Sequence, residues 1–138
     1  MRDPAAAPLR VFILDDHELV RRGFVGILQD SPGFDVVGEA ATRLEALELI
    51  PMCNPDVAVI DVWLPDASGF DVCRELAALC PEVRTLVMSA YDHDDAREAA
   101  LDAGARGYLA KDTSGDDFRA ALLIIGHGGA LADRHGRP

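Results

Sequence analysis

The sequence predicts an α/β domain in which a parallel five-stranded sheet lies between two layers of helices. Short apolar runs alternate with helical patterns along the chain, which is the order that βα units produce. Three runs are almost continuously apolar, as expected of strands buried on both faces, and two are charged or very short, as expected of edge strands. With 138 residues, 49% of them hydrophobic, the chain is long enough for one such domain.

The five strands are predicted at 10–14, 34–40, 56–60, 84–88 and 107–110. The second reads FDVVGEA, with two acidic residues, and the fifth is only GYLA, so both belong at edges of the sheet. The order 2-1-3-4-5 with right-handed crossovers places these two strands outside. The expected architecture is therefore the flavodoxin-like (βα)5 three-layer sandwich.

Five helical segments follow the strands. The second is predicted over 42–50 with Pro51 as its stop, because proline has no N–H to continue the hydrogen bonding. The fifth is predicted to begin at Thr113, with Asp116 three residues later in a box-like cap. Residues expected to face the core from the first, third, fourth and fifth helices are Val20, Phe24, Ile27, Leu28, Cys73, Leu76, Ala77, Cys80, Ala96, Ala99, Ala100, Ala103, Phe118, Ala121, Leu122 and Ile125.

The chain is predicted to consist of a domain at 10–127, a flexible N-terminal segment at 1–9 and a C-terminal tail at 128–138. The tail is too short for a DNA-binding domain, and a net charge of -11 opposes direct contact with nucleic acid. No apolar stretch is long enough to span a membrane, and the opening MRDPAAAPLR has no long apolar region typical of a signal peptide. We therefore expect a cytoplasmic location without membrane contact.

Polar residues follow four of the five predicted strands, and in chain order they are Asp15, Asp16, Asp61, Ser89 and Lys111. The carboxyl ends of parallel strands lie at one edge of the sheet, and ligands bind there at the switch point, here between the first and third strands. Two unit charges about 4 Å apart repel by roughly 4 kcal/mol at an effective dielectric near 20, so clustered carboxylates require protonation or a cation. Oxygen ligands select a hard ion such as Mg²⁺. The pattern predicts a metal site with a reactive carboxylate.

Taken one at a time, these residues have simpler explanations. An Asp or Ser between a strand and a helix commonly caps the helix, and Lys111 could lie in a surface loop. A flavin-phosphate site is disfavoured because DDHELV, after the first strand, places two acids where a phosphate would bind. A phosphatase with an aspartyl nucleophile is disfavoured because His17 stands where that class needs a second acid.

Four segments carry a resemblance to a known family: ILDDHELVRRG, PDVAVIDVWLPDASGFDVCREL, TLVMSAYD and GARGYLAKD. Together they resemble the receiver domain of two-component response regulators, over nearly the whole chain. DDHELVRRG, SAY and KD look like the NarL/LuxR-type subfamily, and the wording is most similar to actinobacterial regulators of the dormancy-regulator kind. Asp112 departs from the broader superfamily, in which many receivers have proline after the lysine.

The resemblance implies a role for each residue of the acidic cluster. Asp61 matches the phosphoacceptor, which takes a phosphoryl group from a sensor histidine kinase. Asp15 and Asp16 match the acid pair that holds Mg²⁺, with Asp61 itself and the backbone carbonyl of Trp63 as further ligands. Lys111 matches the lysine that pairs with the phosphoryl group. Such a domain is a signalling phosphoacceptor and not an enzyme in the usual sense, since it catalyses only its own phosphorylation and dephosphorylation.

The resemblance also implies a switch, in which Ser89 donates to the phosphoryl group and Tyr108 turns inward. The alanines of the fourth helix bury little apolar area, which would hold that helix weakly, although alanine also packs helices closely. Two aromatic residues, Trp63 and Tyr91, are predicted to gate the water that hydrolyses the acyl phosphate, and the alternative is that they cover apolar surface or face a partner.

The implied output is control of transcription through a helix-turn-helix domain that this sequence does not contain. The chain is then either the receiver half of a longer protein or a stand-alone receiver. Phosphorylation-dependent homodimerisation is a further expectation. The rival interpretation is a pseudo-receiver, an interaction module that is never phosphorylated, but such a module should lack one or more of the site residues.

Overall fold

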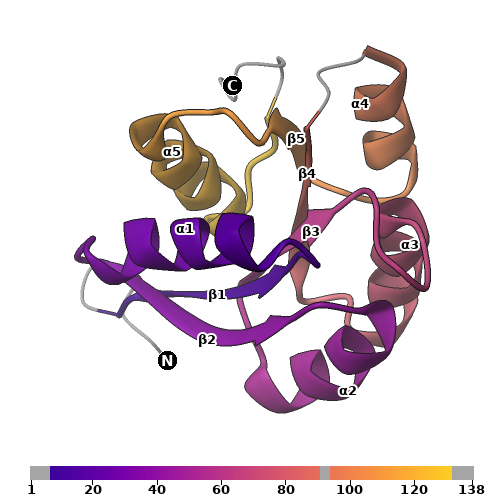
Figure 1. The fold of residues 1–138 in the computed structure, drawn as a ribbon, viewed down its shortest axis with the longest axis horizontal. Helices are drawn as coiled ribbons and strands as arrows, with labels where there is room; N and C mark the ends of the chain where they lie inside the picture. Colours follow the sequence, from indigo (N-terminus) through magenta and orange to yellow (C-terminus); the bar gives the residue numbers. More distant parts are fainter. Residues whose placement is uncertain (1–6, 91–93, 132–138) are drawn as a thin grey trace.

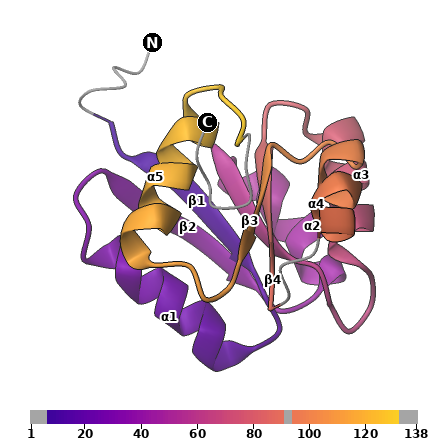
Figure 2. The same cartoon turned by 90° about the horizontal axis from the view of Figure 1, so that it is seen from above.

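The computed structural model describes residues 7–90 and 94–131, which form a parallel five-stranded sheet in the order β2-β1-β3-β4-β5. The strands are β1 (Leu9–Leu14), β2 (Phe34–Ala40), β3 (Val57–Asp61), β4 (Arg84–Ser89) and β5 (Gly107–Ala110). The helices are α1 (Glu18–Gln29), α2 (Arg43–Cys53), α3 (Gly69–Leu79), α4 (Asp94–Asp102) and α5 (Gly115–Gly126). Helices α1 and α5 cover one face of the sheet, and α2, α3 and α4 cover the other (Figures 1 and 2). The predicted sandwich and strand order are confirmed.

The strands are buried as their sequences predict. Every residue of β3 is buried, and β1 and β4 have one half-buried residue each. In β2 a single residue is buried, which agrees with its position at the edge beside β1. The other edge strand, β5, is limited to four residues, and a short edge offers few unpaired backbone groups to another chain.

The two faces of the sheet carry cores of different composition. On the α1 and α5 face the rings of Phe24 and Phe118 pack with centroids 4.8 Å apart, beside other large side chains. On the opposite face the buried side chains at and just beyond α4 are those of Ala100 and Ala103. Since buried apolar area scales with side-chain size, α4 has the smaller hydrophobic attachment to the sheet.

Helix α2 does not stop at Pro51, as the sequence analysis predicts, but continues to Cys53. Proline removes only the hydrogen bond that its own N–H would have made, and near the C-terminus this loss is confined to the last turn. The helix ends at Asn54, whose φ of 50° lies in the left-handed region and whose N–H donates to the carbonyl of Ile50 at 2.9 Å.

Two further details of the helices differ from prediction. Helix α5 is capped by Ser114 rather than Thr113, and the Ser114 Oγ accepts from the N–H of Asp117 at 3.1 Å. Ala77 is exposed, because the buried stripe of α3 runs through Val72, Cys73 and Leu76 and leaves it on the flank. The other predicted inner-face residues are buried or half-buried.

The described chain stays packed on both sides of the predicted 10–127 domain. Leu9 is buried at the start of β1, and a Cβ added at Gly126 would meet its side chain. Leu131 is also buried, lies against Gly107 and donates its N–H to the carbonyl of Arg106 at 2.9 Å. Residues 1–6 and 132–138 of the predicted terminal segments lie outside the described residues. Among the described helices, none combines the length and apolarity needed to cross a bilayer.

Candidate functional site

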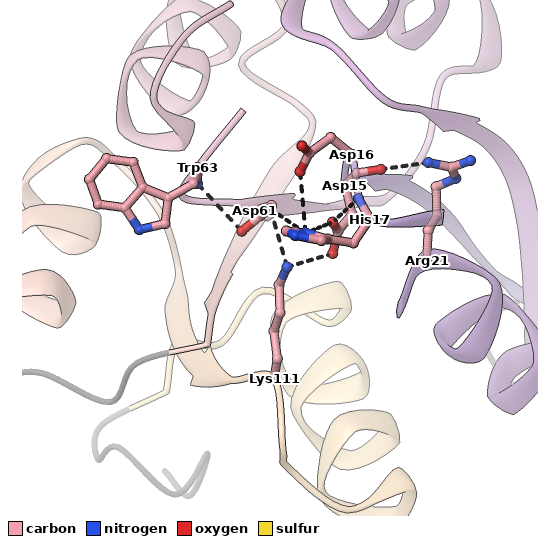
Figure 3. A network of polar contacts seen from close by, with 7 residues as sticks. All are labelled: Asp15, Asp16, His17, Arg21, Asp61, Trp63 and Lys111. Atoms are coloured by element: carbon pink, nitrogen blue, oxygen red, sulfur yellow. Dashed lines mark hydrogen bonds and ion pairs between the residues drawn. The ribbon is translucent and has the colours of Figure 1, made fainter. Parts of the chain in front are cut away.

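The carboxyl ends of three strands bring the predicted acidic residues and lysine together (Figure 3). Asp15 directly follows β1, Asp61 is the last residue of β3, and Lys111 directly follows β5. The sequence analysis places Asp61 and Ser89 just after their strands, but each is the last residue of its strand, paired in register with the neighbouring strand. This pairing fixes the position of the Asp61 backbone at the switch point of the sheet.

Lys111 contacts the two buried carboxylates at once. Its Nζ lies 2.8 Å from Asp15 Oδ2 and 3.1 Å from Asp61 Oδ2. The carboxylate side chains are 4% and 3% exposed, and that of Lys111 is 12% exposed. The backbone holds the lysine in place, because its N–H donates to the carbonyl of Ser89 at 2.7 Å. The ammonium therefore compensates negative charge inside the domain, where water screens it poorly.

The backbone of Asp15 is tied to α1 and to the sheet edge. Its carbonyl accepts a hydrogen bond from the guanidinium of Arg21 at 2.6 Å. The same guanidinium pairs with Glu39 on β2 at 3.0 Å. In addition, Asp15 Oδ1 accepts from the N–H of His17 at 2.8 Å. These bonds fix the turn between β1 and α1 and direct the acid pair toward the crevice.

His17 is the site residue that the sequence analysis missed. Its Nδ1 lies 3.3 Å from Asp16 Oδ1, 3.4 Å from Asp15 Oδ1 and 3.9 Å from Asp61 Oδ2. His17 is the N-cap residue of α1, yet its side chain makes no capping bond. Its place directly after the acid pair was the available signal, since a residue at the start of that helix lies beside the switch point.

Burial and, to a smaller extent, the nearby charge of Asp15 raise the pKa of the Asp61 carboxyl, which lies at about 6. The ammonium of Lys111 and the N–H of Trp63 act in the opposite sense by stabilising the carboxylate. The carboxyl is thus mainly ionised at neutral pH, but its charge is destabilised by its surroundings.

The loop between β3 and α3 covers one side of Asp61. The N–H of Trp63 points to Asp61 Oδ1 at 3.4 Å, and the indole itself is 66% exposed. Trp63 and Ser68 pair as an isolated antiparallel bridge, which folds the loop back on itself. Below it, a Cβ on Gly69 would come within 2.2 Å of the Asp61 carbonyl oxygen. The close approach explains why the segment DVWLPDASG, which runs from Asp61 to Gly69, ends in glycine, because any side chain there would push α3 away from β3.

The remaining predicted residues are placed as follows. Ser89 is buried at the end of β4, and Tyr108 is 1% exposed within β5. The tyrosine ring is thus already inside the core, whereas the sequence analysis expects it to turn inward on phosphorylation. Tyr91, the second gating residue, lies outside the described residues.

The donor set fits a divalent cation. Ligand atoms from Asp15, Asp16, His17 and Asp61 all lie within 4.8 Å of one another. Three carboxylates against the ammonium of Lys111 leave an excess of negative charge, and oxygen ligands favour a hard ion. A buried oxygen, Asp61 Oδ2, has an ion-pair contact with Lys111 but no hydrogen bond of normal geometry, so it retains capacity to bind a ligand.

A parallel sheet with buried carboxylates and a lysine at its carboxyl edge defines the receiver class of signalling domains. A sequence profile of the response regulator receiver domain matches residues 11–123. The chain therefore belongs to the response regulator receiver domain family, and its relatives place it in the NarL/LuxR-type subfamily.

Curated relatives are transcription factors about twice as long as the matched region. The DNA-binding transcriptional activator DevR/DosR of Mycobacterium tuberculosis is 45% identical over 91% of this chain and 58% of its own length. The transcriptional regulatory protein UhpA of Salmonella typhimurium is 37% identical over 88% of this chain and 60% of its own length. The chain thus spans little more than half of these relatives.

Solved structures agree. The signal receiver domain of the response regulator NarL from Mycobacterium tuberculosis is 37% identical, with a TM-score of 0.84 over 88% of this chain and 98% of that one. A LuxR-family two-component response regulator from Aurantimonas is 29% identical, with a TM-score of 0.86 over 91% of this chain and 90% of that one.

Proposed function

We propose that Asp61 accepts a phosphoryl group from the phosphohistidine of a sensor histidine kinase. An Asp61 carboxylate oxygen attacks phosphorus, the P–N bond breaks, and its electron pair stays on the imidazole, which takes up a proton from water. The product is an acyl phosphate. The observation that carries this proposal is a buried, ionised carboxylate paired with Lys111 at 3.1 Å. Phosphoryl transfer depends mainly on positioning and charge stabilisation, and this pair supplies both.

The side chains around Asp61 divide the work. Lys111, already beside Oδ2, pairs with an oxygen of the transferred group as charge builds there. Asp15, Asp16 and Asp61, with the carbonyl of Trp63, would hold Mg²⁺. When bound, the ion neutralises charge on the acceptor and on the phosphoryl oxygens. The N–H of Trp63 orients the other Asp61 oxygen.

The response to phosphorylation follows from the added charge. Ser89 donates its hydroxyl to the new phosphoryl group and draws the end of β4 toward Asp61. Helix α4, which buries less apolar area against the sheet, shifts with the end of β4. The side chain of Tyr108, on β5, then changes position. The surface formed by α4, β5 and α5 then differs between the two states. Trp63 and Tyr91 restrict the water that hydrolyses the acyl phosphate, which makes the signal long-lived.

The role in the cell follows from the relatives. DevR/DosR and UhpA are transcriptional regulators, so we propose that this domain controls transcription in the cytoplasm through a DNA-binding domain. Phosphorylation would act by homodimerisation. The domain itself does not bind DNA specifically, because its net charge is -11. A sequence-dependent gel shift by this chain alone would contradict that.

The test is to incubate the protein with Mg²⁺ and acetyl phosphate and measure the intact mass. We expect one added phosphoryl group in the parent and in Asp35→Asn, an exposed acid on the edge strand β2, and none in Asp61→Asn. EDTA should prevent the addition. An unmodified parent under these conditions would favour the pseudo-receiver, a module that binds partners without being phosphorylated.

A further inference from the structure

The loop that covers Asp61 is bonded to a helix distant in the sequence. Asp66, in the middle of this loop, accepts hydrogen bonds from two backbone N–H groups at the start of α2. Its Oδ1 lies 2.8 Å from the N–H of Arg43, and its Oδ2 lies 3.1 Å from the N–H of Leu44. These bonds hold the pKa of the Asp66 carboxyl below its usual value, as expected when a carboxylate accepts from a helix N-terminus.

The helix already has a cap of its own. Thr42 is the N-cap residue of α2, and its Oγ1 accepts from the N–H of Glu45 at 3.2 Å. Glu45 Oε1 in turn accepts from the N–H of Ala41, the residue before the N-cap, at 3.3 Å. The first turn of α2 is thus stabilised by its own residues, whereas Asp66 lies in an exposed loop. Asp66 therefore adds two bonds between the loop and a helix end that already has its own N-cap.

A second bond closes a ring through α3. The guanidinium of Arg43 binds both carboxylate oxygens of Glu75, one of them through Nε at 2.7 Å. Arg43 therefore contacts the loop through its backbone and α3 through its side chain. Since the loop leads directly into α3, which begins after the Ser68 cap, the loop is restrained from the outside by α2 and at its end by α3.

The restrained segment includes Trp63, whose carbonyl would be a ligand of Mg²⁺ under the proposal above. Within the loop the N–H of Leu64 donates to the carbonyl of Ala67 at 3.2 Å, and Trp63 pairs with Ser68. These short-range bonds define the shape of the loop, and the N–H of Val62, which donates to the carbonyl of Met88 at 3.1 Å, ties its first residue to the sheet, whereas the tip of the loop is not held by them. Asp66 bonds the tip of the loop directly to a separate element, helix α2.

We propose that Asp66 is a positioning residue that fixes the loop between β3 and α3, so that the Trp63 carbonyl is ordered before Mg²⁺ binds. The inference rests on the proposed function of Asp61 and its metal. A ligand that is already ordered binds without a further loss of conformational entropy. Asp66 should therefore influence the affinity for Mg²⁺ and leave the rate of phosphoryl transfer at saturating Mg²⁺ nearly unchanged.

The experiment compares Asp66→Ala and Asp66→Asn with Glu48→Ala, which removes an exposed acid from α2 and serves as the charge control. Mg²⁺ binding is measured by calorimetry, and the mobility of the loop by the fluorescence anisotropy of Trp63, the single tryptophan. Phosphorylation by acetyl phosphate is measured as a function of Mg²⁺ concentration. Urea unfolding gives the stability of each variant.

We expect Asp66→Ala to raise the Mg²⁺ dissociation constant by about fivefold to tenfold and to lower the Trp63 anisotropy. Asp66→Asn, which keeps one acceptor oxygen, should lie between it and the parent, and Glu48→Ala should match the parent. An unchanged dissociation constant in both Asp66 variants would overturn the proposal and leave Asp66 as a helix cap only. If the parent binds Mg²⁺ but is never phosphorylated, the function proposed for Asp61 fails, while the Mg²⁺ and anisotropy data still decide the role of Asp66.

Discussion

The middle of the sheet and its carboxyl edge are equally buried, but burial has opposite consequences in the two regions. Ile60 is 0% exposed and Asp61, the next residue of β3, is 3% exposed. The isoleucine contributes apolar area removed from water. The aspartate carries a charge removed from water, which its raised pKa reveals. The comparison indicates that the acidic edge reduces the stability of the metal-free domain.

Truncation in the middle of the sheet should have the largest effect. Ile60→Ala leaves a cavity in a packed core and should lower the free energy of unfolding by about 4 kcal/mol. Urea unfolding with EDTA measures it, and Ile60→Val, with about 1 kcal/mol expected, is the graded control. Equal losses in both variants would indicate that the core relaxes around the site.

Removal of the charge of Asp61, the residue after Ile60, should change the free energy of unfolding in the opposite direction. Asp61→Asn should raise the free energy of unfolding by about 3 kcal/mol at pH 7 without metal, since the pKa of about 6 exceeds the unfolded value of 3.8.

The pH dependence gives the sign a second test. A group whose pKa is raised by folding binds its proton more tightly in the folded state, so its contribution to stability increases as the pH falls through 6 toward 4. The difference between Asp61→Asn and the parent should therefore shrink over that window. Using the difference removes the opposite contribution of Asp66 and Glu75, whose pKa values are lowered by their hydrogen bonds. A constant difference would contradict the assigned pKa.

The acid pair should affect the metal more than the fold. Asp16→Ala is expected to raise the Mg²⁺ dissociation constant about tenfold, which is about 1.4 kcal/mol, and to reduce phosphorylation at limiting Mg²⁺. Calorimetry measures the affinity, with Glu18→Ala as a control that removes one exposed acid from the same turn. An unchanged affinity in Asp16→Ala would exclude it as a ligand.

The smallest change is expected at the two aromatic residues proposed to restrict water, Trp63 and Tyr91. The phosphorylated parent should decay over hours, and Trp63→Asn and Tyr91→Ala should each decay a few-fold faster, because water reaches the acyl phosphate more easily. Decay is followed by intact mass after removal of the phosphodonor. If both variants decay like the parent, Trp63 and Tyr91 belong to a contact with a partner.

The sequence was sufficient for the fold because apolar patterning alone distinguishes inner from edge strands. The charged FDVVGEA and the short GYLA both lie at edges, as predicted. The end of α2 was predicted wrongly, because Pro51 is a stop signal by itself, whereas the helix continues for two more residues and ends with the bond of Asn54 to Ile50. A rule that considers one residue cannot include that bond.

The candidate site could be predicted where each residue follows its own strand, and not where contacts cross the chain. The convergence of Asp61 and Lys111 follows from strand order and is present. The bond of Asp66 to the start of α2 spans 23 residues and joins a loop to a helix that no periodicity connects. His17 was expected near the site, at the start of a helix, but was assigned no function because no spacing of histidines suggests a zinc site, and only the geometry shows its ring beside the carboxylates.

The packing of Leu9 on Gly126 and of Leu131 on Gly107 determines where a conformational change at the site would reach the two ends of the described chain. Both contacts lie at the amino edge of the sheet, so the described chain enters and leaves at the pole opposite Asp61. A conformational change at Asp61 must therefore pass along the length of a strand before it reaches the ends of the described chain. The route along β5 is four residues long, about 13 Å, and Tyr108 lies in the middle of it. A single short strand, β5, thus connects the acidic site with the point where the described chain leaves the domain.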